Sequence, residues 1–229
     1  PVRNGGLYLD AAIGSIRNQT FAGFELLVID DGSSDETPEI VQKHRREDPR
    51  IRIFETGGAG IVAALNLGIA EAHGDLIARM DADDVAMPGR FELQVRYMED
   101  HPALVACGTC VDWIDASGNK TGEKNAILTG LIAIADLLNG NRFFHPTMMI
   151  RREALVAAGL YRTGCTFAED YDLWLRLAER GSLANVPEIL LLFRKHGAQT
   201  STAKRLAQRA ATALARQAAF RRTNGFDEG

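Results

Sequence analysis

Short apolar runs alternate with amphipathic segments along the first half of the chain, and the two patterns have the periods of strands and helices. Brief apolar runs of strand length predict strands at 24–29, 51–54, 76–80 and 104–114. Between them, apolar residues at helical spacing predict helices at 7–18, 37–46 and 61–72, and from Arg90 to just before Pro102. This alternation is typical of an α/β fold in which helices flank a sheet.

The regular alternation stops after residue 114, where a polar loop with two glycines follows. Later segments predict strands at 148–150 and 186–193, a helix beginning near Arg152, a helix at 173–179 and a last helix from Ala203. We therefore place a boundary near Gly108. The predicted parts are 1–108, 109–202 and a C-terminal helix, 203–229.

The predicted strand 76–80 ends in three carboxylates, those of Asp81, Asp83 and Asp84. In open α/β sheets, ligands bind outside the carboxyl ends of the strands. An extended backbone would point Asp81 and Asp83 the same way, and two such like charges need a cation between them. Hard cations such as Mg²⁺ and Mn²⁺ bind carboxylate oxygens and share their other positions with phosphate and water. The alternative is a solvated turn whose acids cap the next helix.

A calcium loop of the EF-hand type does not fit this stretch, because Val85 and Ala86 occupy the positions of a ligand and of the sharp-turn glycine. A second strand end also carries acids, Asp30 and Asp31. Ser33, Ser34 or Asp35 can cap the helix that follows, which leaves one of the paired aspartates for a ligand. A carboxylate there could accept hydrogen bonds from a nucleobase N–H, although capping explains it equally well.

A glycine loop joins the strand at 51–54 to the next helix. It contains G-x-G-x-x-A at Gly58, Gly60 and Ala63, with Asp81 at a suitable distance beyond. This pattern supports an NAD(P)-binding Rossmann protein as an alternative. Against that alternative, the fingerprint normally follows the first strand of its unit, and here an earlier strand and helix carry acids of their own.

Amino-acid composition further limits the class of protein and its expected partners. The chain has 229 residues, 46% hydrophobic and 24% charged, with a net charge of −4, so it is a globular protein for which nucleic acid is not an expected partner. Its apolar runs are too short to cross a bilayer. We see no signal peptide, and we leave the natural N-terminus open because the chain opens on Pro1. Cys107 and Cys110 form a single C-x-x-C, which favours buried thiols in a reducing cytosol over zinc.

The C-terminal segment from Ala203 is rich in alanine, arginine and glutamine. Its composition is that of a packing arm, an oligomer contact such as a homodimer, or a helix on a membrane surface.

Taken in order, the motifs of this chain resemble those of family 2 inverting glycosyltransferases with the GT-A nucleotide-sugar fold. The matching segments cover nearly the whole sequence: 1–4, 29–35, 60–68, 73–75, 78–84, 88–90, 145–146, 169–174 and 194–196. The resemblance implies a Rossmann-like mixed sheet flanked by helices, with 1–108 as the nucleotide-sugar-binding half and 109–202 as the acceptor-binding and catalytic half. It also implies a strand before Pro1.

The resemblance assigns roles to individual residues. The donor-binding residues it implies are Pro1, Val2, Arg3, Asp31, Gly60, Arg79, Asp81, Ala82 and Asp83. Asp83, with Asp81 and His196, would hold the metal, and Asp31 would bind the base. Asp170, paired with Glu169, would be the catalytic base, and inversion requires such a base on the face opposite the leaving diphosphate. His145 and Trp174 would lie on the acceptor side, although packing explains both residues as well.

The implied activity is transfer of a sugar from a UDP-sugar to a hydroxyl of a glycan or lipid-linked acceptor, with Mn²⁺ or Mg²⁺ as cofactor. The Q-x-x-R-W signature of processive synthases is absent from the sequence, which favours a single-addition, hexosyltransferase-like enzyme of polysaccharide and cell-envelope biosynthesis. We expect it in the cytoplasm, with peripheral contact at the inner face of the membrane. A catalytically silent sugar-nucleotide-binding protein is the remaining alternative.

Overall fold

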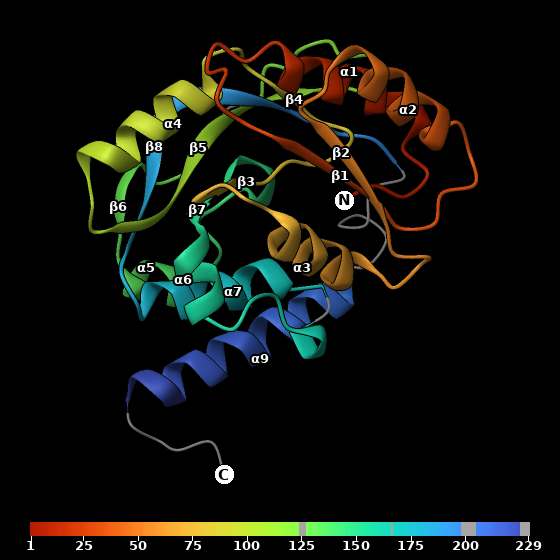
Figure 1. The fold of residues 1–229 in the computed structure, drawn as a ribbon. Coiled ribbons are helices and arrows are strands. Elements are labelled where there is room, and N and C mark those ends of the chain that lie inside the picture. Colours follow the sequence, from red (N-terminus) through yellow and green to blue (C-terminus); the bar gives the residue numbers. More distant parts are fainter. Residues whose placement is uncertain (124–126, 166, 198–204, 225–229) are drawn as a thin grey trace.

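The computed structural model describes residues 1–123, 127–165, 167–197 and 205–224, which form layers of helices around two sheets (Figure 1). The strands are β1 (Leu26–Asp30), β2 (Ile51–Glu55), β3 (Leu76–Ala78), β4 (Val85–Ala86), β5 (Leu104–Ile114), β6 (Gly130–Ile132), β7 (Met149–Arg151) and β8 (Ser182–Arg194). The α-helices are α1 (Gly6–Arg17), α2 (Thr37–Glu47), α3 (Ile61–Glu71), α4 (Arg90–Asp100), α5 (Ile134–Leu138), α6 (Arg152–Ala157), α7 (Glu169–Ala178) and α9 (Arg205–Thr223), and short 3-10 turns lie at His145–Thr147 and Thr163–Cys165.

The smaller sheet consists of β1 and β2, which run parallel. Side chains alternate across β1, so Val28 packs with apolar residues of α1 and α2, while Ile29 lies against Gly68 of α3 on the opposite face. Val2 extends this sheet, since its N–H donates to the Ile29 carbonyl (2.8 Å) and its carbonyl accepts from the Asp31 N–H (2.8 Å). The chain therefore enters the fold alongside β1.

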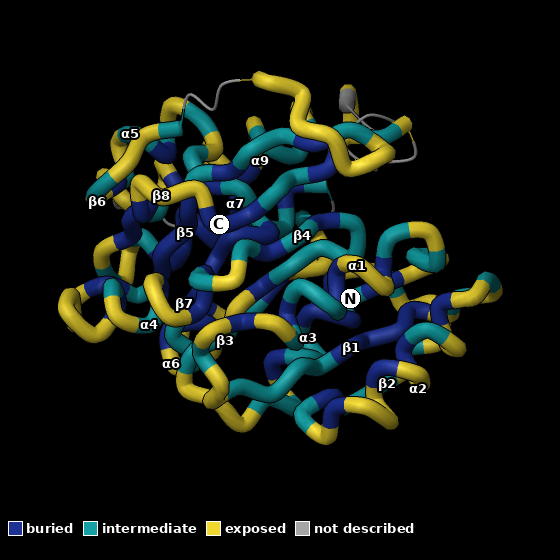
Figure 2. The backbone as a smooth tube through the Cα atoms, turned by 90° about the horizontal axis from the view of Figure 1, so that it is seen from above, coloured by how far each residue is buried: buried dark blue, intermediate teal, exposed yellow. Residues whose placement is uncertain are grey.

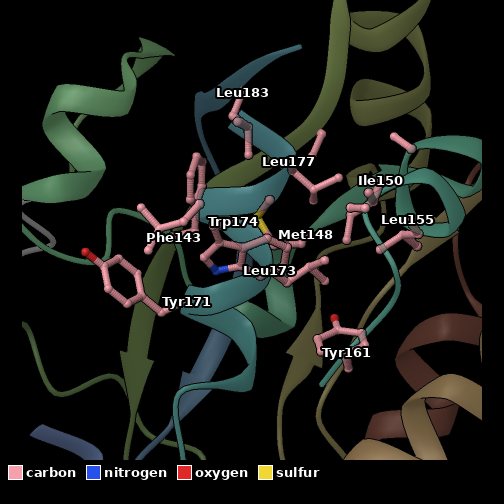
Figure 3. Close-up of a cluster of buried hydrophobic side chains, with 14 of the residues drawn as sticks. Phe143, Met148, Ile150, Leu155, Tyr161, Tyr171, Leu173, Trp174, Leu177 and Leu183 are labelled. Atoms are coloured by element: carbon pink, nitrogen blue, oxygen red, sulfur yellow. The ribbon is translucent and has the colours of Figure 1, made fainter. Parts of the chain in front are cut away.

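The larger sheet has the order β3-β7-β5-β8-β4, with β6 paired to β8. β5 and β8 run parallel along their length, whereas β3, β4, β6 and β7 pair antiparallel to their neighbours. Burial concentrates along β5, β7 and β8 (Figure 2). Below them, Trp174 of α7 lies at the centre of an apolar cluster with Met148, Phe143 and Leu173 (Figure 3). The predicted α/β class and its mixed sheet flanked by helices are confirmed.

A cleft of about 710 Å³ separates the two sheets, lined by β1 on one side and β3 on the other. Its walls are mostly apolar, and α3 covers one of them. The Ile29 carbonyl points toward Val2, away from β2. Because residues two apart in a strand direct their backbone groups the same way, the N–H and carbonyl of Leu27 also point to this side, into the cleft. Arg79 turns its N–H toward β7, so Ala78 turns its backbone groups toward the cleft. Two strand edges, which form no sheet pairing there with any other strand among the described residues, thus face each other across it.

Most predicted elements are present, with different boundaries. β8 begins four residues before the predicted strand at Val186, and α7 begins at Glu169 rather than Leu173. The predicted boundary at Gly108 falls inside β5, so the two proposed halves share that strand. The sequence analysis missed β4 and β6, because strands of two and three residues are too short to show a period. Among the described residues, none of the helices has the length and apolar character needed to cross a membrane.

We expect an apolar extension before Pro1 to stabilise the protein by pairing with both edges of the cleft. An added segment of valine and isoleucine, as long as β1 (5 residues), should raise the Tm by at least about 5 °C in calorimetry. The matched control carries proline at alternate positions of the extension, which removes the N–H donors that pairing needs. Equal Tm values for the two extensions would contradict the expectation.

Candidate functional site

Three carboxylates meet in a turn at the carboxyl end of β3. Asp81, Asp83 and Asp84 each offer a ligand atom, and these atoms lie within 4.8 Å of one another. The expected extended backbone is wrong here, because β3 ends at Ala78 and a turn at 82–83 follows. The turn brings Asp84 into the group, where an extended strand would have pointed it away.

Two buried arginines hold this acid turn in place. The Arg79 guanidinium forms an ion pair with Asp81 (Nη1 to Oδ2, 2.5 Å). Arg194, the last residue of β8, donates its backbone N–H to Asp84 Oδ1 (2.8 Å) and its Nε–H to the Asp83 carbonyl (2.7 Å). The same guanidinium also bonds the carbonyls of the loop after β5. The turn is therefore fixed from β3, from β8 and from that loop.

Asp84 is the most buried member of the acid turn, with 1% of its surface exposed. Burial, together with the charges of Asp81 and Asp83, raises the pKa of its carboxyl to about 9. Its Oδ2 has no hydrogen-bond partner within the described part of the chain. Three closely spaced carboxylates, one of them with an unpaired buried oxygen, are a donor set that fits a hard divalent cation.

The segment after β8 reaches the same acids. His196 Nε2 donates to Asp83 Oδ2 (2.9 Å), so the structure brings these two predicted metal residues together. The His196 ring also packs on Tyr8 of α1, with ring centroids 4.9 Å apart, and the Arg194 guanidinium lies 4.5 Å from the Tyr8 ring centre. Tyr8 therefore links α1 to both residues.

A second pair of acids lies in the first turn of α7. Asp170 accepts the Tyr171 N–H at Oδ1 (2.7 Å) and the Asn141 amide at Oδ2 (3.1 Å). Burial, with the neighbouring Glu169 charge, raises the pKa of the Asp170 carboxyl to about 6. Glu169 Oε2 has no hydrogen-bond partner in the described residues. An acid with this pKa can take up a proton near neutral pH.

The pKa of the Tyr161 hydroxyl depends on the charges of both acid groups. Burial raises the pKa of its hydroxyl, Arg79 opposes that shift, and Asp170, Glu169 and Asp81 all add to it. Arg79 likewise lowers the pKa of Asp170. The charge of Arg79, which is paired with Asp81, therefore acts on residues of both acid groups.

The two residues expected on the acceptor side differ in burial: His145 is partly exposed, and Trp174 is fully buried. His145 Nε2 is bonded to the Tyr161 hydroxyl (2.8 Å), and burial together with Arg79 holds its pKa well below the ordinary value. Trp174 is fully buried (0% exposed), with Phe143 beside its ring (Figure 3). The His145 ring also lies against it, with ring centroids 5.6 Å apart. Trp174 therefore packs in the core and has no exposed face on which a sugar could stack, which corrects that expectation.

Both oxygens of the Asp31 carboxylate accept hydrogen bonds from within the protein. It accepts the Thr56 hydroxyl (2.5 Å) and the Gly60 N–H (3.1 Å to each oxygen), and Arg3 lies 3.9 Å away. Gly60 adopts φ 92° and precedes α3, so the carboxylate occupies the positive end of that helix. A dinucleotide pyrophosphate would need that same helix end, which disfavours the NAD(P) alternative.

Predicted donor-binding residues from the start of the chain lie next to those of the acid turn. Pro1, Val2, Asp81 and Ala82 line one small cavity of about 60 Å³. The structure therefore places the start of the chain beside the acid turn.

Sequence reasoning missed three polar residues of this region. Thr56 binds Asp31, Asn141 binds Asp170, and the charges of both acid groups act on Tyr161, which is bonded to His145. Thr56 opens the glycine loop that the sequence analysis singled out, so its place beside a candidate binding loop was a usable signal. Asn141 and Tyr161 stand in loops with no periodic pattern, so only the tertiary structure reveals them.

The chain is similar in sequence to known glycosyltransferases. The model for glycosyl transferase family 2 matches residues 1–158. An uncharacterized glycosyltransferase of Haemophilus influenzae is 36% identical over 210 residues, which cover 87% of this chain and 65% of the relative. The O-antigen biosynthesis glycosyltransferase WbnJ of Escherichia coli is 36% identical over 199 residues (84% and 76%), and the amylovoran biosynthesis glycosyltransferase AmsE of Erwinia amylovora is 30% identical over 188 residues (81% and 70%).

Solved structures share the fold. S. aureus TarS 1–349, in complex with UDP, superposes with a TM-score of 0.73 at 18% identity, covering 94% of this chain and 63% of TarS. The mannosyltransferase PcManGT of Pyrobaculum calidifontis, in complex with GDP-Man and Mn²⁺, gives a TM-score of 0.69 at 20% identity (97% and 62%). The chain thus spans somewhat less than two thirds of the length of these structures and of the H. influenzae relative.

We expect Asp31→Ala to destabilise the protein by about 2 kcal/mol, because the Gly60 N–H and the Thr56 hydroxyl both lose a charged acceptor. Urea unfolding followed by circular dichroism measures the change. Thr56→Ser is the matched control, since it keeps the hydroxyl and should stay close to the wild type. An Asp31→Ala variant as stable as the wild type would show that these bonds contribute nothing.

Proposed function

The chain belongs to glycosyl transferase family 2, and we propose that it transfers a sugar, with inversion, from a nucleoside-diphosphate donor to an acceptor hydroxyl. The observation that carries the proposal is the acid turn, where ligand atoms of Asp81, Asp83 and Asp84 lie within 4.8 Å of one another. The charge of Arg79, which acts on both Asp81 and Asp170, supports it. Curated relatives are named for O-antigen and amylovoran biosynthesis, so we propose a glycan or lipid-linked acceptor of polysaccharide biosynthesis.

We propose that Asp83, with Asp81 and His196, holds a divalent cation, Mn²⁺ or Mg²⁺. The donor set fits because its oxygens lie within 4.8 Å and Asp84 adds an unpaired buried oxygen to the group. Such a cation, when bound, neutralises charge on a departing diphosphate. Asp81 is paired with the permanently charged Arg79, whereas the partner of Asp83 is His196, itself a proposed ligand, so we take Asp83 as the main ligand.

We propose Asp170 as the general base that takes the proton of the acceptor hydroxyl. Its raised pKa suits proton transfer near neutral pH, and its hydrogen bonds to Asn141 and the Tyr171 N–H fix its direction. Glu169 stands beside it and keeps that pKa raised. His145 serves the acceptor side indirectly, by holding Tyr161 in place.

In the proposed scheme, residues 1–108 bind the sugar donor. Pro1, Val2 and Arg3 line up next to Asp31, and a UDP-sugar is the donor we propose. For Asp31 to bind the base, its carboxylate would have to share or exchange the Gly60 and Thr56 bonds. In this scheme residues 109–202 bind the acceptor and add one sugar at a time.

A catalytically silent sugar-nucleotide binder would have the same fold. The raised pKa of Asp170 favours an enzyme over such a protein, because an ion-paired structural carboxylate would have its pKa lowered. The proposed location is the cytoplasm.

We expect Asp83→Asn to weaken Mn²⁺ binding at least about tenfold, since it replaces an anionic ligand with a neutral amide. Electron paramagnetic resonance of free Mn²⁺ during titration measures binding without any turnover. The control Asp100→Asn removes an exposed acid of α4 and should bind Mn²⁺ like the wild type. Unchanged binding in Asp83→Asn would remove this residue from the metal site.

We expect Asp170→Asn to lower the rate of UDP-sugar hydrolysis or transfer by about 10²- to 10⁴-fold, with little change in donor KM. In the wild type, kcat/KM should fall about tenfold per pH unit below about pH 6, because the base must be deprotonated and its pKa is raised to about 6. Equal activity of Asp170→Asn and wild type would reject the assigned base, and a wild type that binds donor without turnover would favour the silent binder.

A further inference from the structure

The C-terminal helix α9 carries its large apolar side chains on the outside of the molecule. Ala215 (4% exposed) and Ala219 (0%) face the core beside α7, where α9 packs. Leu206, Leu214 and Phe220 are 82%, 67% and 52% exposed. A helix that only covers a core shows the reverse pattern, with large apolar residues inward and polar residues outward.

The outer residues form one continuous stripe. At 100° per residue, Leu206, Leu214 and Phe220 fall within about 120° of the helix circumference, on the side opposite Ala215 and Ala219. Ala210, Ala213 and Gln217 lie between them on the same side. Figure 1 shows α9 at the edge of the molecule, below α6 and α7. Nothing else in the described chain lies beyond it in that view.

The stripe is bordered by positive charge. The sequence of α9 holds five arginines and no acidic residue, although the whole chain has a net charge of −4. Arg209, Arg216 and Arg221 are exposed. Arg209 and Arg216 border the stripe along one side, and Arg221 lies within it beside Leu214. Arg222 points to the other side of the helix, where it forms an ion pair with Glu179 (2.9 Å).

We propose that the outer face of α9 lies on the surface of an anionic phospholipid membrane. An apolar stripe with flanking arginines matches such a surface, because the apolar side chains enter the acyl boundary while the guanidinium groups meet lipid phosphates. A second copy of the chain is a poorer partner, since paired α9 helices would bring arginines against arginines with no acid between them. This membrane contact goes beyond the sugar-transfer reaction and does not depend on it.

Vesicle co-sedimentation of the full chain tests the proposal. Vesicles of phosphatidylcholine with about one quarter phosphatidylglycerol should bind the protein, and vesicles of phosphatidylcholine alone should bind it roughly a hundredfold more weakly. About 0.5 M NaCl should weaken the binding in the same direction. Arg209→Gln/Arg216→Gln/Arg221→Gln should reproduce the loss on anionic vesicles.

A matched pair of variants separates the stripe from general surface hydrophobicity. Leu206→Ser/Leu214→Ser should reduce binding to the anionic vesicles at least about tenfold. The control Leu7→Ser/Leu131→Ser changes two leucines that are equally exposed (82% and 70%) on α1 and β6, and its binding should equal that of the wild type. Circular dichroism confirms that each variant is folded.

Three results would overturn the proposal. One is equal binding to neutral and anionic vesicles, and another is an equal loss in both leucine pairs. The third is a wild type that fails to bind vesicles but sediments as a dimer, with Leu206→Ser/Leu214→Ser a monomer, which would assign the stripe to a second copy of the chain.

Discussion

Mutual repulsion among the carboxylates of Asp81, Asp83 and Asp84 is the constraint around which the site is arranged. Their ligand atoms lie within 4.8 Å, and one of them is almost fully buried. Arg79 offsets the charge from the β3 side, and Arg194 fixes the turn through backbone groups at the end of β8. These contacts join two strands of the larger sheet to a single turn, and they leave a concentration of negative charge that a cation would stabilise.

The charge of Arg79 also acts on Asp170, in the first turn of α7. Arg79 is paired with Asp81 and also lowers the pKa of Asp170, while Glu169 and burial raise it. One buried guanidinium therefore influences both the acids suited to a metal and the acid suited to proton transfer. Such separation of two carboxylate environments is how a protein assigns different roles to the same functional group at one pH.

Sequence periodicity predicted the α/β class and most elements because the strands and helices of the first half are long and regular. Acids at the strand ends pointed to one region, since strand ends of open sheets meet at one edge, and the structure gathers Asp81, Asp83 and Asp84 there. The details depended on tertiary packing. Asp84 joins Asp81 and Asp83 because these acids lie in a turn and not on an extended strand. Trp174, expected on the acceptor side, is fully buried in the core. Tyr161 carried no local signal, because its position follows from contacts with distant residues.

The central claim is that the acid turn binds a cation that also holds the donor diphosphate. Anomalous X-ray scattering from crystals grown with Mn²⁺ and UDP tests it most directly. The account expects one manganese peak within coordination distance of Asp83, at about 2.0 to 2.6 Å from a carboxylate oxygen, with the diphosphate of UDP on its open side. UDP bound elsewhere, or a manganese peak with no ligand from the acid turn, would contradict it.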